Sequence, residues 1–276
     1  RLAAPGRAAI VPSSEIAPQG KLRVAILAVN PVVMTRRPDG TLSGVAIDLG
    51  RFIADRLGVP FEPVLYSSAE AYTRSFGQGE WDIALGARGA GAALVDYGRD
   101  FMLVDNMYVA APGREFADAG QVDRPGVKVA VAKDGAPDRF LSRTLKAAEI
   151  VRIPAGRDAA IQTLRTGKAD VYGSNGMIVH AVADGLSGAK IVPDQFTIVP
   201  QAIAIPKGRS AAAQGRLAEI VDEAKRTGLV QKALERAGVR GGVLALEPGR
   251  IHRPRVQARG RAGLKPLDRQ AQFQQR

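Results

Sequence analysis

The sequence has no cysteine, two histidines and a low aromatic content of 5%. Without cysteine the chain cannot form disulfides, thiolate nucleophiles or cysteine–zinc sites, and it is compatible with an oxidising compartment. No run of about 18 apolar residues is present, so we expect no membrane-spanning helix. The hydrophobic content of 46% nevertheless supports a packed core, which Val, Ile, Leu and Ala must largely fill.

Positive charge is concentrated at the C-terminal end of the sequence. Residues 248–276 contain eight Lys or Arg residues and one Asp, which gives them +7 of the total net charge of +12. This segment is poor in apolar residues and rich in Arg, Gln, Gly and Pro, a composition typical of disorder. We therefore interpret residues 241–276 as a basic, disordered tail, with an anion- or membrane-surface-binding segment as the alternative.

The N-terminal residues 1–20 are rich in Ala, Pro, Gly and Ser, and we interpret them as a leader or linker. The sequence opens on Arg1 rather than Met. We therefore expect a processed chain or a fragment, from which any secretion signal has already been removed.

The stretch from Asp39 to Tyr66 predicts a strand–helix–strand unit of a parallel sheet. Apolar residues recur at the helical period between 44 and 57, and Gly58 and Pro60 end the expected helix. The carboxyl ends of parallel strands are where such sheets bind ligands. The expected elements of this half are strand 22–29, helix 44–57, strand 61–66, helix 68–76 and strand 81–87.

The same order of elements recurs after residue 127. The sequence GKADVY at 167–172 matches GEWDIA at 79–84 at an offset of 88 residues. One GxxD match is common by chance, whereas the whole ordered series is not, so we infer two α/β lobes of like architecture. The expected elements of the second half are strand 127–132, helix 137–148, strand 149–153, helix 157–166 and a strand after Asp170.

Two extended segments join the halves. Leu103–Ala111 leads out of the first half and Phe196–Ile205 leads back, followed by two helices, of which the first is capped by Ser210. We therefore predict an α/β, two-lobed clamshell with two interlobe crossover strands. Lobe 1 is expected to comprise residues 21–105 and 202–240, and lobe 2 residues 106–201 including the crossovers.

Several runs of the sequence, taken in order, resemble one protein family. They are DGTLSGVAIDLGRFIADRLGVPFEPVLY, GQGEWDIAL, VDYGRDF, RPGVKVAVAKDG, LRTGKADV, AIAIPKGR and IVDEAKRTGLVQKALERAG, within about residues 20–240. No single run is specific, but the series is similar to periplasmic solute-binding proteins of ABC transporters, of the polar amino-acid type (family 3). The resemblance implies the type-II periplasmic binding fold, a ligand in an interlobe cleft, and Venus-flytrap closure that a permease recognises.

The chain departs from that family's pattern where a free amino acid would be bound. Relatives hold the α-carboxylate with an Arg whose position here is Gly91, and they offer a Ser or Thr where Gly135 stands. The carboxylate with which they hold the amino group matches Asn175. A buried ammonium without its partner costs on the order of several kcal/mol. We therefore expect a ligand other than a standard free α-amino acid.

The candidate ligand-binding residues follow the carboxyl ends of the expected strands, apart from one stacking aromatic ring, Phe101, which the resemblance implies. They are Asn30, Arg88, Phe101, Asp134, Gly135, Ala136, Ser174 and Asn175. A helix N-terminus, expected at 134–136, offers N–H groups that suit an anion. We hypothesise a small carboxylate or other polar or anionic solute, such as an organic acid or amino-acid derivative, anchored by Arg88.

Several of these residues also have a structural interpretation. Arg88 could instead pair with Asp96 or Asp100, and Asn175-Gly176 is itself a turn signal. The sequence also favours structural roles, at helix starts or strand edges, for three aspartates: Asp48, Asp82 and Asp170.

The sequence favours a binding protein over an enzyme. HExxH, GxSxG and P-loop patterns are absent, and His180 and His252 lack the sequence neighbours of a triad or metal site. We expect no cofactor or metal, a periplasmic location, and a monomer whose partners are a small-molecule ligand and an ABC permease. Residues 1–20 cannot supply a helix-turn-helix, so no nucleic-acid partner is expected. Two alternatives stay open: a dehydratase-like periplasmic enzyme of the same fold, and a detached ligand-sensing domain of a receptor.

Overall fold

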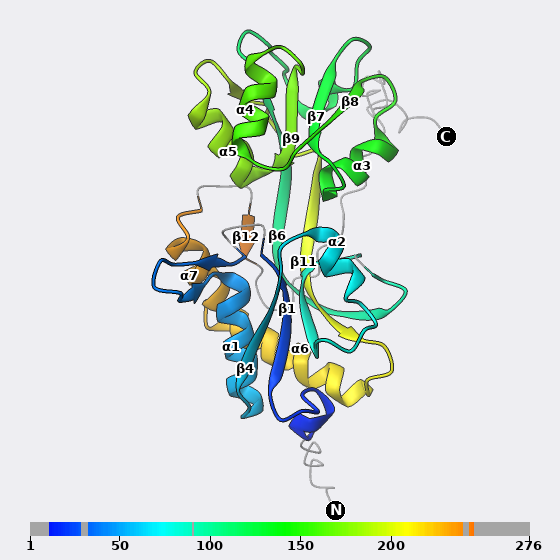
Figure 1. The fold of residues 1–276 in the computed structure, drawn as a ribbon, viewed down its shortest axis with the longest axis vertical. Helices are drawn as coiled ribbons and strands as arrows, with labels where there is room; N and C mark the ends of the chain where they lie inside the picture. Colours follow the sequence, from blue (N-terminus) through cyan, green and yellow to red (C-terminus); the bar gives the residue numbers. More distant parts are fainter. Residues whose placement is uncertain (1–10, 29–32, 90, 240–242, 246–276) are drawn as a thin grey trace, which may run out of the picture.

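The computed structural model describes residues 11–28, 33–89, 91–239 and 243–245. Figure 1 shows two α/β lobes, one above the other, joined by two long strands, β6 (Val95–Ala110) and β11 (Thr197–Pro206). The predicted two-lobed α/β architecture with two crossover strands is therefore confirmed. Within the described residues, no helix has the length and apolar character that crossing a membrane requires.

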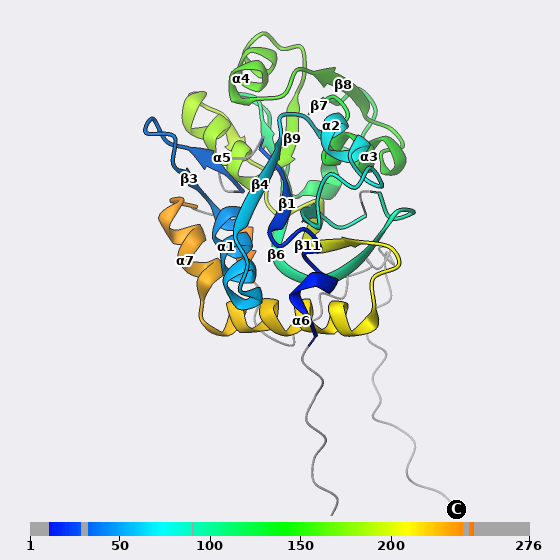
Figure 2. The same ribbon diagram turned by 60° about the horizontal axis from the view of Figure 1, so that its bottom comes forward.

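Lobe 1 forms the lower half of Figure 1. Its elements are η1 (Ser13–Glu15), β1 (Leu22–Leu27), β2 (Thr35–Arg36), β3 (Leu42–Ser43), α1 (Val45–Leu57), β4 (Phe61–Tyr66), α2 (Ala69–Arg74), β5 (Ile83–Ala87), α6 (Ala211–Arg226) and α7 (Leu229–Arg236). The sheet order is β4-β1-β5-β11-β6, with β4, β1 and β5 parallel. On one face of this sheet, an apolar cluster packs the strands against α1, α6 and α7. On the opposite face, a second apolar cluster packs them against α2. Figure 2 shows α6 across the base of the lobe, next to α1 and α7.

The limits of α1 are set by two glycines. Gly44, before the helix, has a φ of 127°, and a Cβ there would lie 2.5 Å from the carbonyl oxygen of Val33, so glycine is required. Gly58 ends the helix in the left-handed conformation. Between them Leu49 and Ile53 are fully buried, as the helical period of the apolar residues predicted.

Lobe 2 repeats this layered plan in the upper half of Figure 1. Its elements are η2 (Ala119–Val122), β7 (Lys128–Ala132), α3 (Ala136–Thr144), β8 (Glu149–Ile153), α4 (Arg157–Arg165), β9 (Val171–Asn175), α5 (Gly176–Gly185) and β10 (Lys190–Ile191). The parallel strands follow the order β9-β7-β8, and β9 pairs with the lobe-2 part of β6. α3 packs on one face of this sheet, and α4 and α5 pack on the other.

α3 ends at Thr144, earlier than the predicted end near residue 148. The reason is the carboxylate of Asp123, which accepts the backbone N–H groups of residues 146–148 at 2.8–3.0 Å. Burial raises the pKa of Asp123, but these hydrogen bonds outweigh it and hold the pKa below its ordinary value. A side chain distant in sequence thus holds these three residues outside the helix.

The repeated GxxD motif has the same structural role in both lobes. The N–H of Asp82 donates to the carbonyl of Arg23 at 2.9 Å, and the Asp82 carboxylate accepts the N–H of Arg23 at 2.9 Å. Asp170 makes the same two hydrogen bonds with Lys128, both at 2.8 Å. Each aspartate therefore fixes the first strand of its lobe to the strand after the motif. The predicted repeat and the structural role of both aspartates are confirmed.

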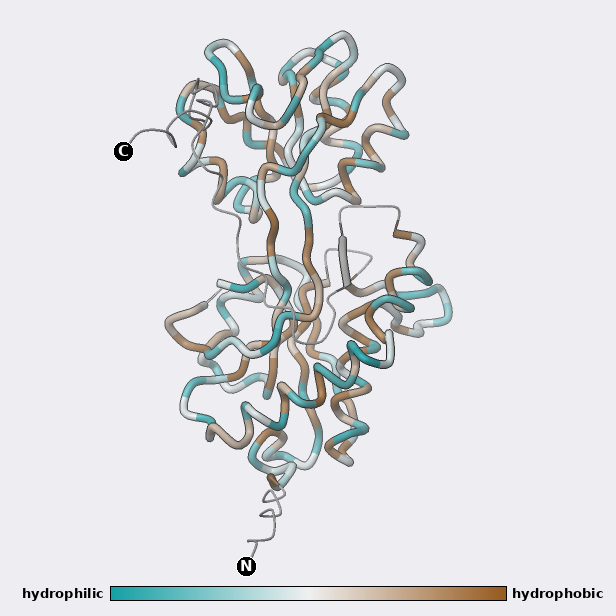
Figure 3. The backbone as a smooth tube through the Cα atoms, turned by 180° about the vertical axis from the view of Figure 1, so that it is seen from behind, coloured by the Kyte–Doolittle hydropathy of each residue, from teal (hydrophilic) through white to brown (hydrophobic). Residues whose placement is uncertain are grey.

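The crossover strands pair with each other along most of their length. β6 and β11 run antiparallel from Val95 opposite Pro206 to Asn106 opposite Thr197, and Figure 3 shows both from behind as extended segments between the lobes. β6 begins at Val95, whereas the sequence predicted an extended segment only from Leu103. The residues after Val95 are mostly polar, so they lack the apolar pattern of a strand. Their backbone nevertheless pairs with β11 and is extended for that reason.

A short strand, β12 (Val243–Ala245), pairs with Met102–Val104 of β6. Because β11 occupies one edge of β6 at these residues, β12 lies on the other edge, which β9 occupies in lobe 2. Three residues of the segment that the sequence assigned to the basic tail therefore belong to the sheet. Residues 246–276 lie outside the described residues.

We predict that Asp82→Ala destabilises the protein more than Asp170→Ala does. Arg23, the ion-pair partner of Asp82, is 13% exposed, so truncation leaves a mostly covered guanidinium without its carboxylate. Arg114, the partner of Asp170, is 60% exposed and can be solvated. We expect urea unfolding to show losses of about 3–5 kcal/mol for Asp82→Ala and about 1–2 kcal/mol for Asp170→Ala. Equal losses would contradict this account.

Candidate ligand-binding site

The carboxyl ends of the parallel strands in the two lobes face each other along the crossover strands. β5 ends at Ala87, opposite Gln201 of β11, and β9 ends at Asn175, opposite Asn106 of β6. The paired segment of β6 and β11 lies between these two points. Ligands of α/β proteins bind outside such carboxyl ends, so this is where the candidate site lies.

A buried carboxylate fixes the loop before α3. Asp134 has a φ of 61°, in the left-handed region, and Gly135 is the N-cap residue of the helix. Asp138, in the first turn, accepts the N–H of Asp134 at 2.9 Å. It also accepts hydrogen bonds from Ser142 at 3.0 Å and from Arg152 at 3.1 Å. The start of α3 is thereby held at the carboxyl end of β7.

Asn175 caps α5 rather than forming a turn. Its Oδ1 accepts the backbone N–H of Ile178 at 3.1 Å, which satisfies one of the free donors at the start of the helix. The asparagine thus uses its acceptor within the protein, while its NH₂ group can act only as a donor.

Asn106 and Asn175 lie on the face of the lobe-2 sheet that α3 covers. They are directly opposite each other in an antiparallel ladder, so their side chains are on the same side. The next pair on this side is Tyr108 and Gly173. A Cβ at Gly173 would lie 3.3 Å from Leu141 of α3, which identifies the face.

The structure brings some predicted residues of lobe 2 together and separates another. Residues 134–136 and Asn175 lie at the same carboxyl edge of the sheet. Ser174 lies on the opposite face of β9, beside Tyr172, and is 7% exposed.

Asn106 is a candidate that sequence reasoning missed. It is 2% exposed, and its Nδ2 is the buried side-chain atom of the described residues that lacks a hydrogen-bond partner. Leaving a buried donor unsatisfied costs about 1–3 kcal/mol, so its presence calls for an explanation. The sequence signal was an asparagine within the apolar run LVDNMYVAA.

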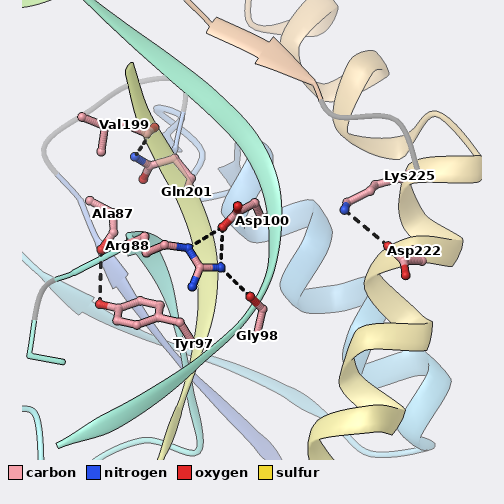
Figure 4. A network of polar contacts seen from close by, with 9 residues as sticks. All are labelled: Ala87, Arg88, Tyr97, Gly98, Asp100, Val199, Gln201, Asp222 and Lys225. Atoms are coloured by element: carbon pink, nitrogen blue, oxygen red, sulfur yellow. Dashed lines mark hydrogen bonds and ion pairs between the residues drawn. The ribbon is translucent and has the colours of Figure 1, made fainter. Parts of the chain in front are cut away.

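In lobe 1, Arg88 follows β5 and is held by β6, as Figure 4 shows. Its Nε and Nη2 donate to Oδ1 of Asp100 at 2.8 and 2.6 Å, and Nη2 donates to the carbonyl of Gly98 at 2.6 Å. Its guanidinium lies 5.3 Å from the ring centre of Tyr97. The expected structural alternative, an ion pair with Asp100, is therefore present, and 37% of the Arg88 side chain remains exposed.

The remaining predicted positions of lobe 1 offer less to a ligand. Gly91 has a φ of 64°, and a Cβ there would lie 2.6 Å from the ring of Phe76, so no side chain fits without displacing that ring. Phe101 is 2% exposed and packs within the lobe-1 core. Asn30 lies outside the described residues.

A separate groove of about 390 Å³ lies between α1 and α7, away from both carboxyl edges. Charged residues of both signs line it, and one pair, Asp48 and Arg236, forms an ion pair at 2.5 Å. A group of three side chains able to hold a metal ion is not found within the part of the chain that the structure describes.

We predict that Asp138 makes stability sensitive to acid. Burial raises the pKa of its carboxyl, but hydrogen bonds from the Asp134 N–H, Arg152 and Ser142 outweigh it and hold the pKa below its ordinary value of 3.8. The stabilisation is therefore present above the unfolded-state pKa and is lost as pH falls through the folded-state pKa. Asp138→Asn should flatten the dependence of Tm on pH between about 5 and 2.

The matched control for this measurement is Asp158→Asn, because the Asp158 side chain is 95% exposed. It removes the same charge from a solvated position and should leave the slope of Tm against pH close to that of wild type. Equal slopes for wild type and Asp138→Asn would show that the Asp138 contacts do not favour the ionised form.

We also predict that Asn175 contributes to stability as a helix cap. Asn175→Ala removes the acceptor for the Ile178 N–H and should lower the free energy of unfolding by about 1 kcal/mol. Asn175→Asp keeps an acceptor at the N-terminus of α5 and should stay within about 0.5 kcal/mol of wild type. Urea unfolding of both variants checks this, and equal losses would count against the capping role.

No protein-family model matches the sequence, and no curated protein matches it. Solved structures are similar to it over most of the chain. An ancestral amino acid-binding protein, described as a precursor of cyclohexadienyl dehydratase, has 22% identity and a TM-score of 0.65, covering 81% of this chain and 98% of that chain. A solute receptor for L-cysteine of Neisseria gonorrhoeae has 17% identity and a TM-score of 0.67, covering 86% and 100%.

A third similar structure is an amino acid ABC transporter substrate-binding protein from Streptococcus pneumoniae, bound to L-arginine. It has 20% identity and a TM-score of 0.65, covering 82% of this chain and 96% of that chain. At such identities the likeness concerns the fold. The sheet order, the paired crossover strands and these neighbours together show that the chain has the two-lobed type-II periplasmic binding fold, as the sequence predicted.

Proposed function

We propose that this protein binds a small polar or anionic solute between its lobes in the periplasm and delivers it to an ABC permease. The observation that carries the proposal is the opposition of two carboxyl edges on lobes that β6 and β11 connect. The names of the similar structures support it, because they describe amino-acid and solute binding, in one case for an ABC transporter.

The contacts between the lobes are compatible with closure around a ligand. Where both partners of an ion pair are described residues, the two belong to the same lobe. Apolar contact across the boundary includes Met177 of α5, which packs against the lobe-1 core. Lobes that are internally tied and joined by two strands can move as rigid bodies about a hinge.

The groups at the two carboxyl edges favour a ligand that has acceptor oxygens over a ligand that has an ammonium group. Asn175 presents an NH₂ donor where binding of an ammonium would require a carboxylate. The start of α3 carries partial positive charge, and Arg88 is cationic. Gly91 cannot hold the carboxylate-binding Arg that the resembling family places there. We therefore propose a small carboxylate or similar oxygen-rich solute rather than a standard free α-amino acid.

The proposed contacts are Arg88 from lobe 1, and residues 134–136 and Asn175 from lobe 2. A ligand carboxylate at Arg88 would compete with Asp100 for the same guanidinium. The buried side chains of Ser174 and Phe101 contribute only where movement of the lobes exposes them.

Catalysis on the bound solute is the second candidate function. It is favoured by the similarity to a protein described as a precursor of cyclohexadienyl dehydratase. The two functions differ in the fate of the ligand, because a binding protein releases its solute unchanged. Proton NMR of each stabilising compound after incubation with the protein therefore separates them.

We predict the outcome of a thermal-shift screen with acetate, succinate, glutarate, citrate, putrescine, L-arginine, L-glutamine and L-cysteine. At a hundredfold excess over Kd a ligand stabilises the folded state by about 2.7 kcal/mol. At least one carboxylate should raise Tm, whereas putrescine, which has the carbon number of succinate but no acceptor oxygen, should not. Strong stabilisation by the amino acids alone would contradict the proposed ligand class.

Arg88→Ala should weaken binding of the stabilising carboxylate by about tenfold or more, because a charged hydrogen bond is worth about 1.5–3 kcal/mol. Arg74→Ala is the matched control, since its ion pair with Glu70 lies on the exposed surface of α2. An affinity unchanged by Arg88→Ala would rule out Arg88 as the anchor.

A further inference from the structure

We infer that crossover strand β6 itself supplies a ligand-binding group. This group is the side-chain amide of Asn106, which with the amide of Asn175 forms a pair of donors for a carboxylate or carbonyl oxygen of the solute. The inference deepens the proposed function and rests on it.

Strand β6 does not need the side chain of Asn106. The carbonyl of Asn106 accepts the N–H of Phe196 at 2.9 Å, and its backbone continues the ladders with β11 and β9. Neighbouring positions of β6, such as Tyr108 and Val109, are filled by buried apolar or aromatic residues. An amide that is 2% exposed, with Nδ2 unpartnered, therefore destabilises a strand that an apolar residue would suit better.

Asn106 lies at the boundary between the two lobes. Asn106 is the residue at which pairing with β11 ends, opposite Thr197, and pairing with β9 begins, opposite Asn175. It therefore lies where the crossover strand passes from one lobe to the other. A ligand atom bound here contacts the part of the chain that changes when the lobes rotate relative to each other.

The residues around Asn106 suit an acceptor oxygen of a ligand. Asn175 lies directly opposite Asn106, and its Oδ1 accepts the Ile178 N–H, so its NH₂ group is the part of the amide left for a ligand, as Nδ2 is for Asn106. The aromatic rings of Tyr108 and Phe196, 4.4 Å apart, lie in the apolar cluster on this face. Hydrogen bonds in such apolar surroundings are stronger than in water.

The test combines ligand-free stability with binding. Asn106→Leu keeps the branching of the side chain and removes the donor, whereas Asn106→Asp replaces the donor with a charged acceptor. Met107→Leu is the matched control, because Met107 is the next residue of β6 and faces the α5 side of the sheet. Urea unfolding without ligand gives stability, and isothermal titration with the carboxylate that most stabilises wild type gives affinity.

We expect ligand-free Asn106→Leu to be at least as stable as wild type and to bind the carboxylate at least about tenfold more weakly. Asn106→Asp should bind more weakly still, because it sets a negative charge against the ligand. Met107→Leu should match wild type in both measurements.

Two results would overturn the inference and leave the proposed function standing. One is a clear loss of ligand-free stability in Asn106→Leu, which would show that the amide has a structural partner. The other is wild-type affinity in a stable Asn106→Leu. If no carboxylate stabilises the wild-type protein, the proposed ligand class is wrong. The inference about Asn106, which rests on that class, is then wrong as well.

Discussion

The pairing of β6 with β11 is the constraint on which the rest of the structure depends. Its register places the carboxyl end of β5 and that of β9 on either side of one short segment, and so creates the candidate site. The irregularities of this ladder lie between Gln201 and Ala204, in its lobe-1 half. Such irregularities bend and twist a strand. The ladder is regular from Gln201 to Thr197, which lies opposite Asn106.

At the proposed site, uncharged residues (Gly91 and Asn175) occupy positions where the resembling family places charged partners for a zwitterion. Phe76 fills the space that a side chain at residue 91 would occupy. The side-chain acceptor of Asn175, Oδ1, is used to cap α5. The loop at 134–136 is held by Asp138, which is anchored to Arg152. The proposed site would therefore combine a rigidly held loop with groups that favour oxygen acceptors.

Features encoded locally were predictable from the sequence. Glycines set the ends of α1, and the spacing of two GxxD motifs identified Asp82 and Asp170 as equivalent. Features that depend on distant contacts were not predictable in the same way. The start of β6 depends on β11, the end of α3 depends on Asp123, and the unpartnered amide of Asn106 depends on strand register. For Arg88, sequence could name Asp100 as a partner but could not choose it over Asp96.

The short strand β12 has a consequence for association between molecules. A strand with one unpaired edge offers N–H and C=O groups to the sheet of another chain, which promotes aggregation. β9 covers one edge of β6 from Asn106 onward, and β12 covers the same edge over Met102–Val104. β12 therefore covers backbone groups of a crossover strand that would otherwise be available as a template for intermolecular β-sheet.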